Sequence, residues 1–472
     1  MFPDTSCFPL PLVPFERYLL LDDRPDYPMT FFVQLNLTGR LGPEAFDAAI
    51  GEALSRHPLL RAHVARVPGR GLCWVATRGS GPAVSWAGCG VPLVYPGSHR
   101  IDLAAEVGLR IWIRGGDDAT VVTFQFHHVC CDGIGALQFI GDLMACYGIR
   151  TATTDPKPTL RDVDPAALLR RGDVPKVDLP PTVGRLRVLW ETLREAVRFA
   201  VRRITPLGTP KAPIGYPVPF SSDENRESPQ RDARSLAPLD GVQSLWIDAT
   251  KARQLASVAA ARGATVNDLL IRDLLVTMDA WQSVARPGRS APWLRIVMPT
   301  NLRPSRRTVM PAANVLSFAF LTRRRTECRD PDALLAGIQF ETHAIKRWKL
   351  GSYFLATVTC LQRIPGALAL WTSGKRCLAT ALLTNLGSDA TRSFTARFPR
   401  REGRIVMGDV RLEGLIGVAP LRRATRASLA VLGYAGGFSL TAYCDPQSFP
   451  AETTGEFLAL YRDRIEKTIA DA

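Results

Sequence analysis

One short segment combines residue types that could carry chemistry: residues 127–133, which read HHVCCDG. Two of the six histidines of the chain stand side by side in it, His127 and His128. An imidazole titrates near physiological pH and in its neutral form can take a proton from a reacting group. General base catalysis by a histidine is therefore one kind of chemistry that this segment allows.

The residues alone also allow three other interpretations of this segment: a metal site, a cysteine nucleophile and a buried structural histidine pair. A metal site would need ligands on one side of the chain, but neighbouring side chains of an extended backbone point to opposite faces. No CxxC pair or HxxxH cluster completes a zinc site either, so we expect no metal. Cys131 could act as a nucleophile beside His128, and His127 and His128 could also form a buried structural pair.

The segment lies where a strand should pass into a helix. Residues 119–127, ATVVTFQFH, are rich in β-branched and aromatic side chains and predict a strand. After Gly133 the apolar residues recur every three or four positions, which predicts a helix. Residues 30–38 and 109–115 predict two more strands, and Pro43 suits the first turn of a helix that ends before Pro58.

A second globular region is expected from about residue 243 onward. It should begin with a strand and two helices, the second capped by Thr265 with Asp268 in its first turn. The same region also predicts strands at 294–300 and 314–322, a helix from Pro331, an apolar stretch at 352–371, late strands up to 445 and a last helix at 451–470.

The length of 472 residues favours two domains. We expect one over 1–150, a crossover linker over 151–242 and a second over 243–472. The linker holds a basic amphipathic helix at 184–204, GRLRVLWETLREAVRFAVRRI, which could pack on a domain or rest on anionic lipid.

Composition limits the classes of partner and compartment. The formal net charge of +15 favours anionic partners, such as a phosphorylated cosubstrate, an acidic carrier protein or a membrane surface. No zinc-finger spacing or basic block with interleaved aromatics supports nucleic acid binding. The ten scattered cysteines, including Cys360 and Cys377 in apolar runs, read as unpaired thiols of a protein core. With no signal peptide or spanning segment in the pattern, we expect a cytoplasmic monomer, with peripheral membrane contact as an option.

The segment HHVCCDG resembles the HHxxxDG signature of the chloramphenicol acetyltransferase and condensation-domain superfamily. Four other segments agree in order along the chain. RHPLLRA at 56–62 is similar to the start of that superfamily. GATVNDLLIRDLL at 263–275, VMPTNLR at 297–303 and LLTNLG at 382–387 resemble the wax ester synthase and diacylglycerol acyltransferase-like branch. The DFGWG segment of plant BAHD acyltransferases is missing, and MGDVRLEG at 407–414 keeps only its glycine and aspartate.

This resemblance implies an α+β fold, with two acetyltransferase-like subdomains and a tunnel between them. It implies transfer of an acyl group from acyl-CoA or a phosphopantetheinyl thioester to a small hydroxyl or amine acceptor, with no permanently bound cofactor. His128 would be the general base, Asp132 would hold the turn, often against an arginine, and His127 and Gly133 would support the motif.

The resemblance leaves the oxyanion donor and the reaction product open. Asn301 and Asn385 could donate to the oxyanion or serve the second-domain side of the site, or they could only stabilise turns. Arg303 could meet a cosubstrate phosphate. Two rivals remain beside ester formation: a stand-alone condensation enzyme that forms an amide, and a catalytically silent binding protein that kept the fold.

Overall fold

The computed structural model describes residues 7–471 except 78–80, 154–155, 174–240, 286–291, 304–309, 349, 374–376, 388–390, 392–393, 447–448 and 450. The helix expected over 184–204 lies outside the described residues, as does most of the linker expected over 151–242.

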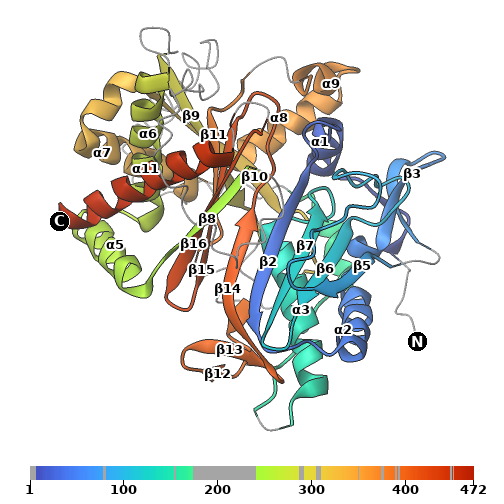
Figure 1. The fold of residues 1–472 in the computed structure, drawn as a ribbon. Coiled ribbons are helices and arrows are strands. Elements are labelled where there is room, and N and C mark those ends of the chain that lie inside the picture. The colour runs from blue at the N-terminus through green and yellow to red at the C-terminus, as the bar shows by residue number, and fades with distance from the viewer. Residues whose placement is uncertain are drawn as a thin grey trace, which may run out of the picture.

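The first sheet contains seven strands of the described chain, in the order β12-β13-β14-β2-β7-β6-β5 (Figure 1). All neighbours are antiparallel except β5 and β6, which run parallel. The strand bounds are β2 Thr30–Thr38, β5 Ala83–Gly88, β6 Leu109–Gly115, β7 Ala119–His127, β12 Arg400–Arg401, β13 Arg404–Met407 and β14 Val410–Val418. The three strands expected at 30–38, 109–115 and 119–127 are confirmed.

Two helices pack together along this sheet, α2 (Pro43–Arg56) and α3 (Gly133–Thr151). Pro43 occupies the first turn of α2, as expected, because its fixed φ suits a helix start and its missing N–H would have no partner there. A third helix, α1 (Pro14–Asp22), precedes β2 and lies at the end of the sheet where β7 finishes.

The second sheet has the order β10-β9-β11-β15-β16-β8 among the described strands. Its strands are β8 Val242–Ile247, β9 Trp293–Asn301, β10 Leu316–Arg324, β11 Ala381–Asn385, β15 Ala427–Tyr434 and β16 Gly437–Cys444. β11 runs parallel to both of its neighbours, and the other pairs are antiparallel. Ala435 and Gly436 join β15 to β16 with φ values of 47° and 84°, the left-handed pair that a tight hairpin turn needs.

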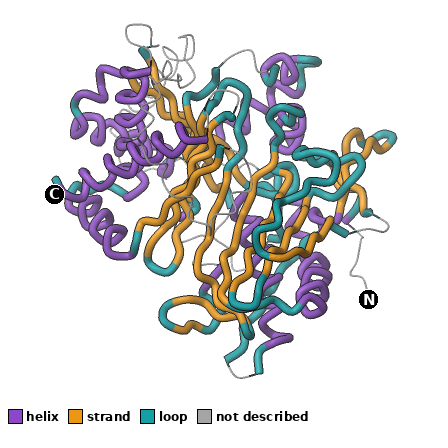
Figure 2. The backbone as a smooth tube through the Cα atoms, in the orientation of Figure 1, coloured by secondary structure: helices purple, strands orange, loops and turns teal. Residues whose placement is uncertain are grey.

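Four helices cover the outer face of the second sheet (Figure 2): α5 Ala249–Ala261, α6 Val266–Ala285, α7 Pro331–Arg347 and α11 Ala451–Ala470. The expected cap of α6 is present, because Thr265 Oγ1 accepts the N–H of Asp268 while the Asp268 carboxylate accepts the N–H of Thr265. Successive side chains along each strand point to opposite faces of this sheet. Leu383 packs in the core under these helices, whereas Leu382 packs in the core shared with the first sheet.

Two short helices and a small sheet also belong to the described part of the chain. α8 (Ser352–Gln362) and α9 (Ala367–Trp371) fill the expected apolar stretch and pack against α1. A three-stranded sheet, β1-β4-β3, joins Leu10–Pro11, Gly71–Ala76 and Ala62–Val67. α2 ends before Pro58, as expected, and residues 58–61 form a 3₁₀ turn that leads into β3.

The two sheets are linked through one strand. β14 belongs in sequence to the C-terminal part of the chain, yet it pairs along β2 from Arg411 opposite Thr38 to Val418 opposite Phe32. Gly417 allows this strand to pass close to the second sheet, since a Cβ there would meet a methyl carbon of Leu432 at 2.6 Å. The expected α+β fold with two sheet-and-helix halves is confirmed.

Candidate active site

The HHVCCDG segment forms the turn between the end of β7 and the start of α3. β7 ends at His127, and Asp132 is the N-cap of α3, where its carboxylate accepts the N–H of Gly135 at 2.8 Å. Backbone N–H groups of both histidines are bound: His127 donates to Gly108 O at 2.9 Å and His128 to Met29 O at 2.7 Å. The turn therefore has a fixed geometry, and its two imidazoles leave the strand in different directions.

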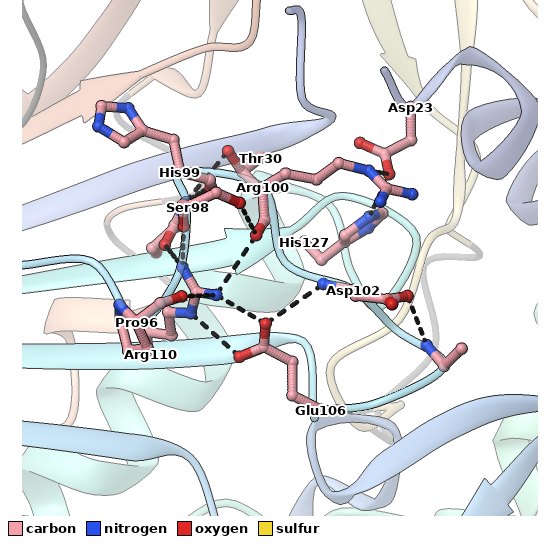
Figure 3. Close-up of polar contacts among 12 residues, drawn as sticks. Asp23, Thr30, Pro96, Ser98, His99, Arg100, Asp102, Glu106, Arg110 and His127 are labelled. Atoms are coloured by element: carbon pink, nitrogen blue, oxygen red, sulfur yellow. Dashed lines mark hydrogen bonds and ion pairs between the residues drawn. The ribbon is translucent and has the colours of Figure 1, made fainter. Parts of the chain in front are cut away.

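His127 is fully buried and points toward Asp23 (Figure 3). Its Nδ1 accepts the N–H of Val129 at 3.2 Å, and its Nε2 lies 3.5 Å from Oδ2 of Asp23. Arg100 Nε donates to the same carboxylate oxygen at 2.7 Å. Burial alone would raise the pKa of Asp23, but its contacts with His127, Met29 and Arg100 outweigh it and lower that pKa.

The segment that supplies Arg100 is itself held by the buried Arg110 of β6 (Figure 3). The guanidinium of Arg110 donates to Glu106 at 2.6 Å and to the carbonyl oxygens of Ser98, Pro96 and Arg100 at 2.7–3.3 Å. Because these bonds fix the loop that reaches Asp23, they also fix the surroundings of His127.

His128 is half-buried, and its ring lines a cavity between the two sheets. The ring of Phe31 packs against it with centroids 5.1 Å apart. Burial lowers the pKa of His128, although its own carbonyl, Asp132 and Asn314 act in the opposite direction. The imidazole is therefore neutral near pH 7, the state in which it can accept a proton.

Residues of the C-terminal half hold the turn from the other side. Asn314 Nδ2 donates to the carbonyl oxygens of His128 and Val129, at 2.6 and 2.8 Å. The N–H of Val315 donates to Oδ2 of Asp132 at 3.0 Å. These contacts connect the position of the His128 backbone to the second sheet.

Asp132 forms a two-pronged ion pair with Arg303. Nη1 of Arg303 donates to Oδ2 and Nη2 to Oδ1, both at 2.8 Å, and the two side chains are 12% and 2% exposed. Burial would raise the pKa of Asp132, but the charge and hydrogen bonds of Arg303 and the N–H groups of Val315 and Gly135 lower it. Arg303 thus uses its guanidinium on Asp132, and not on a cosubstrate phosphate as the sequence had suggested.

The two cysteines of the motif are fully buried. Burial raises the pKa of the Cys131 thiol well above its ordinary value, and it does the same for Cys130. A buried neutral thiol is a poor nucleophile, so the structure disfavours the thiol interpretation. Among the described residues no His, Cys, Asp and Glu side chains group in a way that could hold a metal ion.

Elsewhere the cysteines only partly match the expected core positions. Six are buried, and these are Cys73, Cys130, Cys131, Cys146, Cys328 and Cys444. Cys360 is exposed on α8 and Cys377 is half-buried, so the expectation for these two was wrong. Their apolar neighbours pack inward, but the helical position of Cys360 faces outward.

The cavity lined by His128 has an empty volume of about 730 Å³, part of it open to solvent. Its wall is mostly apolar and comes from both halves of the chain, with Phe31 and Val33 from β2 and Phe318, Leu382 and Leu432 from the second sheet. The side chain of Leu386 reaches Gly133 so closely that a Cβ there would lie 2.9 Å from it. The cavity therefore offers an apolar ligand space beside the imidazole.

One part of the cavity wall is polar. Nε and Nη2 of Arg422 both donate to the carboxylate of Asp22, and the bond from Nη2 is 3.0 Å long. The guanidinium carbon of Arg422 lies 5.5 Å from the ring centroid of Tyr18. The Tyr18 hydroxyl is buried and has no hydrogen-bond partner within the described part of the chain. Burial raises the pKa of Tyr18 against the opposing charge of Arg422, so this phenol keeps its proton and can donate it to a ligand oxygen.

The two asparagines expected near the site do not line the cavity within the described structure. Oδ1 of Asn301 accepts the N–H of Arg303 at 3.0 Å, and Oδ1 of Asn385 accepts the N–H of Gly387 at 2.8 Å. Nδ2 of Asn385 donates to Asn267 at 3.2 Å. Both side chains thus brace turns, the alternative that their residue type had also suggested.

Thr384 is a cavity residue that the sequence interpretation missed. It stands next to Asn385 on β11, and neighbouring side chains of a strand face opposite ways. Leu382, Thr384 and Leu386 all line the cavity, so a spacing of two from the apolar residues of LLTNLG could have identified the threonine in place of the asparagine.

We compared the sequence and the fold of this chain with those of known proteins. No protein-family model matches the chain. The isonitrile lipopeptide synthase of Mycobacterium tuberculosis is 33% identical over 134 residues, which make up 26% of this chain and only 5% of that protein. An uncharacterized protein of the same organism is 24% identical over 457 residues, or 92% of this chain and 94% of that protein.

A solved starter condensation domain of rhizomide synthetase, in complex with C8-CoA, superposes with a TM-score of 0.63 at 12% identity. The match covers 98% of this chain and 95% of that domain. The chain has the condensation-domain fold. Condensation domains of peptide and polyketide synthetases share this fold, so the fold that the HHxxxDG resemblance implied is confirmed. The narrower resemblance to the wax ester synthase branch stays a prediction.

Proposed function

We propose that this condensation-fold protein transfers an acyl group from a thioester to a hydroxyl or amine, with His128 as the general base. The observation that carries the proposal is a neutral imidazole lining an apolar cavity where the two sheets meet. A general base must reach the acceptor proton in its unprotonated form. His128 suits both requirements better than His127, because His128 lines the cavity and has a lowered pKa, whereas His127 is fully buried against Asp23.

The reaction follows from the position of the ring. Nδ1 of His128 is buried, so an acceptor in the cavity would approach Nε2. The imidazole takes the acceptor proton while the acceptor oxygen or nitrogen attacks the thioester carbonyl. The tetrahedral intermediate then collapses, the C–S bond breaks, and the leaving thiolate takes the proton back from the imidazolium. No permanently bound cofactor takes part in this scheme.

The other motif residues act in this proposal as positioning residues. Asp132 accepts hydrogen bonds from Arg303, Gly135 and Val315, which leave its carboxylate no free site for a substrate. Its task is to hold the turn that presents His128. Gly133 keeps the start of α3 close to Leu386, in the cavity wall.

Hydroxyl groups in the cavity wall are the candidate donors for the oxyanion. Thr384 enters from the second sheet and Tyr18 from α1, and both line the cavity that His128 lines. A hydroxyl donor aimed at the developing charge stabilises a tetrahedral intermediate. We prefer Thr384 and Tyr18 to Asn301 and Asn385, whose side chains are occupied in turns.

The donor is proposed to be acyl-CoA or a carrier-bound phosphopantetheinyl thioester. The related starter condensation domain was solved with C8-CoA, which supports a medium acyl chain, and the apolar cavity wall fits such a chain. A carrier protein as partner, a monomeric state and lipid contact by residues 184–204 remain proposals drawn from the sequence.

The test is turnover with a panel of acyl-CoAs, each combined with alcohol and amine acceptors, read by release of free thiol and by mass spectrometry of the products. His128→Ala should lower turnover by roughly 10²–10⁴-fold, the usual contribution of a general base. His343→Ala, an exposed histidine on α7, is the matched control and should not change it.

The chemical nature of the product distinguishes the proposed function from its two alternatives. An ester product supports the proposal, and an amide product would identify the amide-forming alternative with the same base. Full turnover by His128→Ala would reject the assigned base. Thioester binding without any turnover by the wild type would favour the silent binding protein.

A further inference from the structure

The outer face of α8 carries no charged side chain. Its exposed residues are Tyr353, Ala356, Thr357 and Cys360, spaced by three and four positions along one helical stripe. A surface helix of a soluble domain normally turns charged and polar side chains to water. Within residues 351–373, which span α8, α9 and the turn between them, Arg363 is the single charged residue.

Large apolar side chains on this surface point into solvent. Leu370 of α9 is 77% exposed, Ile364 in the preceding turn 59%, Tyr353 of α8 51% and Leu21 of α1 45%. The three helices contact one another and lie together at one margin of the molecule, where α9 projects at the upper right of Figure 1. We call these four residues the apolar edge. Exposed apolar residues that gather in one place mark an interaction surface.

The apolar edge is held firmly from within, so its exposure is a feature of the folded state. Gln362 Nε2 donates to Pro14 O at 2.7 Å, and Arg24 Nη2 donates to Thr372 O at 2.6 Å, which ties α1 to α8 and α9 at both ends. Beneath the surface, the ring of Phe354 lies 5.3 Å from that of Tyr18. Aromatic packing thus fixes the inner face, and the outer face has no partner within the described chain.

The charge of the sequence around α8 and α9 is one-sided, whereas the exposed Asp26 follows Leu21 of α1. Between Glu341 and Asp389 the chain has no acidic residue and six basic ones. Among the described members, Lys346, Arg347 and Arg363 are exposed. Basic side chains around a projecting apolar surface favour a partner that offers anionic groups above an apolar layer.

We propose that the apolar edge, formed by Leu21, Tyr353, Ile364 and Leu370, docks on an anionic lipid bilayer. Its apolar side chains would enter the acyl boundary while the flanking cations meet the lipid headgroups. No helix of the described chain is long and apolar enough to cross a membrane, so the contact is interfacial. A second copy of the chain fits less well, since two such surfaces would bring like charges together in a symmetric contact.

This surface lies behind the cavity wall. Phe354 contacts Tyr18 and Phe318, with ring centroids 5.3 and 5.2 Å apart, and both of these residues line the cavity. Docking would therefore place an apolar cavity close to the lipid phase. The docking proposal does not depend on acyl transfer, because lipid binding is measured without turnover.

The test is flotation of the full chain with vesicles of phosphatidylcholine alone, or of phosphatidylcholine with 30 mol% phosphatidylglycerol. The chain should float with the anionic vesicles and bind the neutral ones more weakly, and added salt should narrow that difference. Leu370→Glu and Ile364→Glu should each lower the apparent partition constant by roughly tenfold, because an inserted apolar side chain becomes an anion. Val284→Glu on α6, where the valine is 68% exposed, is the matched control and should bind as the wild type does.

Several outcomes would overturn the proposal. Undiminished flotation of Leu370→Glu and Ile364→Glu would move the contact elsewhere, for example to residues 184–204. Absence of flotation with anionic vesicles would reject lipid docking outright. A dimer in light scattering that Leu370→Glu makes monomeric would identify the apolar edge as a protein interface. The denaturation midpoints of Leu370→Glu, Ile364→Glu and Val284→Glu must match that of the wild type, so that a loss of binding does not reflect unfolding. Arg363→Gln should reduce only the preference for anionic over neutral vesicles.

Discussion

The ion pair between Asp132 and Arg303 leads to the most demanding prediction. Asp132→Asn keeps the shape of the side chain but removes its charge. The carboxylate accepts four hydrogen bonds, two from Arg303 and one each from the N–H groups of Gly135 and Val315. Each carboxylate oxygen accepts two of these bonds. An asparagine replaces one oxygen by an NH₂ group, so two donors lose their acceptor.

The magnitude follows from burial. Asp132 is 2% exposed and Arg303 12%, so Arg303 would keep a charge that little water can reach. Breaking a buried ion pair by removing one partner costs about 3–5 kcal/mol, and we expect the free energy of unfolding to fall by that amount. Because the two residues come from different halves of the chain, the loss should also increase motion of His128 and lower turnover.

Equilibrium urea unfolding measures this effect. Asp463→Asn is the control, since Asp463 forms an ion pair with Arg462 in which the side chains are 59% and 43% exposed, and it should change stability by less than about 1 kcal/mol. The double variant Asp132→Asn with Arg303→Gln should lose less than the sum of the single variants. A loss below about 1 kcal/mol for Asp132→Asn would refute the assigned strength of the buried pair.

The pH dependence gives a second check on the same pair. The folded protein lowers the pKa of Asp132 below its ordinary value near 3.8. Its contribution to stability is therefore complete above that value and is lost as the pH falls through the lower pKa of the folded state. The stability difference between wild type and Asp132→Asn should consequently shrink in acid and stay constant between pH 5 and about 8.

Two further predictions concern the cavity. Because desolvation lowers the pKa of His128 below 6.5, kcat/KM should stay level down to about pH 6.5 and fall tenfold per pH unit only below the lowered pKa. A decline in kcat/KM centred above pH 6.5 would contradict a base with a lowered pKa. Gly133→Ala should change the free energy of unfolding by less than about 1 kcal/mol, because the atom nearest its Cβ, at 2.9 Å, is a terminal methyl group of the half-buried Leu386, which can turn into the cavity. Thermal unfolding measures this change, and a loss above about 3 kcal/mol would show that Leu386 cannot move aside.

The strands next to the HHVCCDG segment could be predicted because their signals are local. Residues 119–127 are rich in β-branched and aromatic side chains, and β7 has these bounds. α2 begins at Pro43, and α6 carries the predicted Thr265 cap with Asp268. Each of these signals acts within a few residues, where propensity and capping decide the structure.

Other elements escaped prediction because their signals are weak or come from distant neighbours. β4 and β5 are six residues long and only partly buried, so they lack a clear alternation of apolar and polar residues. The partnership of Arg303 with Asp132 joins residues that are far apart in sequence, and no local pattern reports it. The role of Asn314 at the carbonyl oxygens of His128 and Val129 is of the same kind.

The same contrast between local signals and distant contacts applies to the site residues. The motif led to the prediction of His128 as the base. The structure adds the physical difference between the two histidines: the ring of His127 contacts Asp23, whereas His128 lines the cavity. Asn301 and Asn385 attracted notice by residue type, whereas Thr384 carries the hydroxyl that lines the cavity. The face of a strand, which the neighbouring leucines of β11 reveal, was the better guide.

The pairing of β14 with β2 has a consequence for how this protein can be divided. A fragment that stops before residue 410 would leave one long edge of β2 with unpaired backbone groups from Phe32 to Thr38. Bare strand edges recruit other chains and promote aggregation. Expressed alone, the N-terminal half should therefore be insoluble, and adding a peptide that spans residues 400–418 should rescue it by strand complementation.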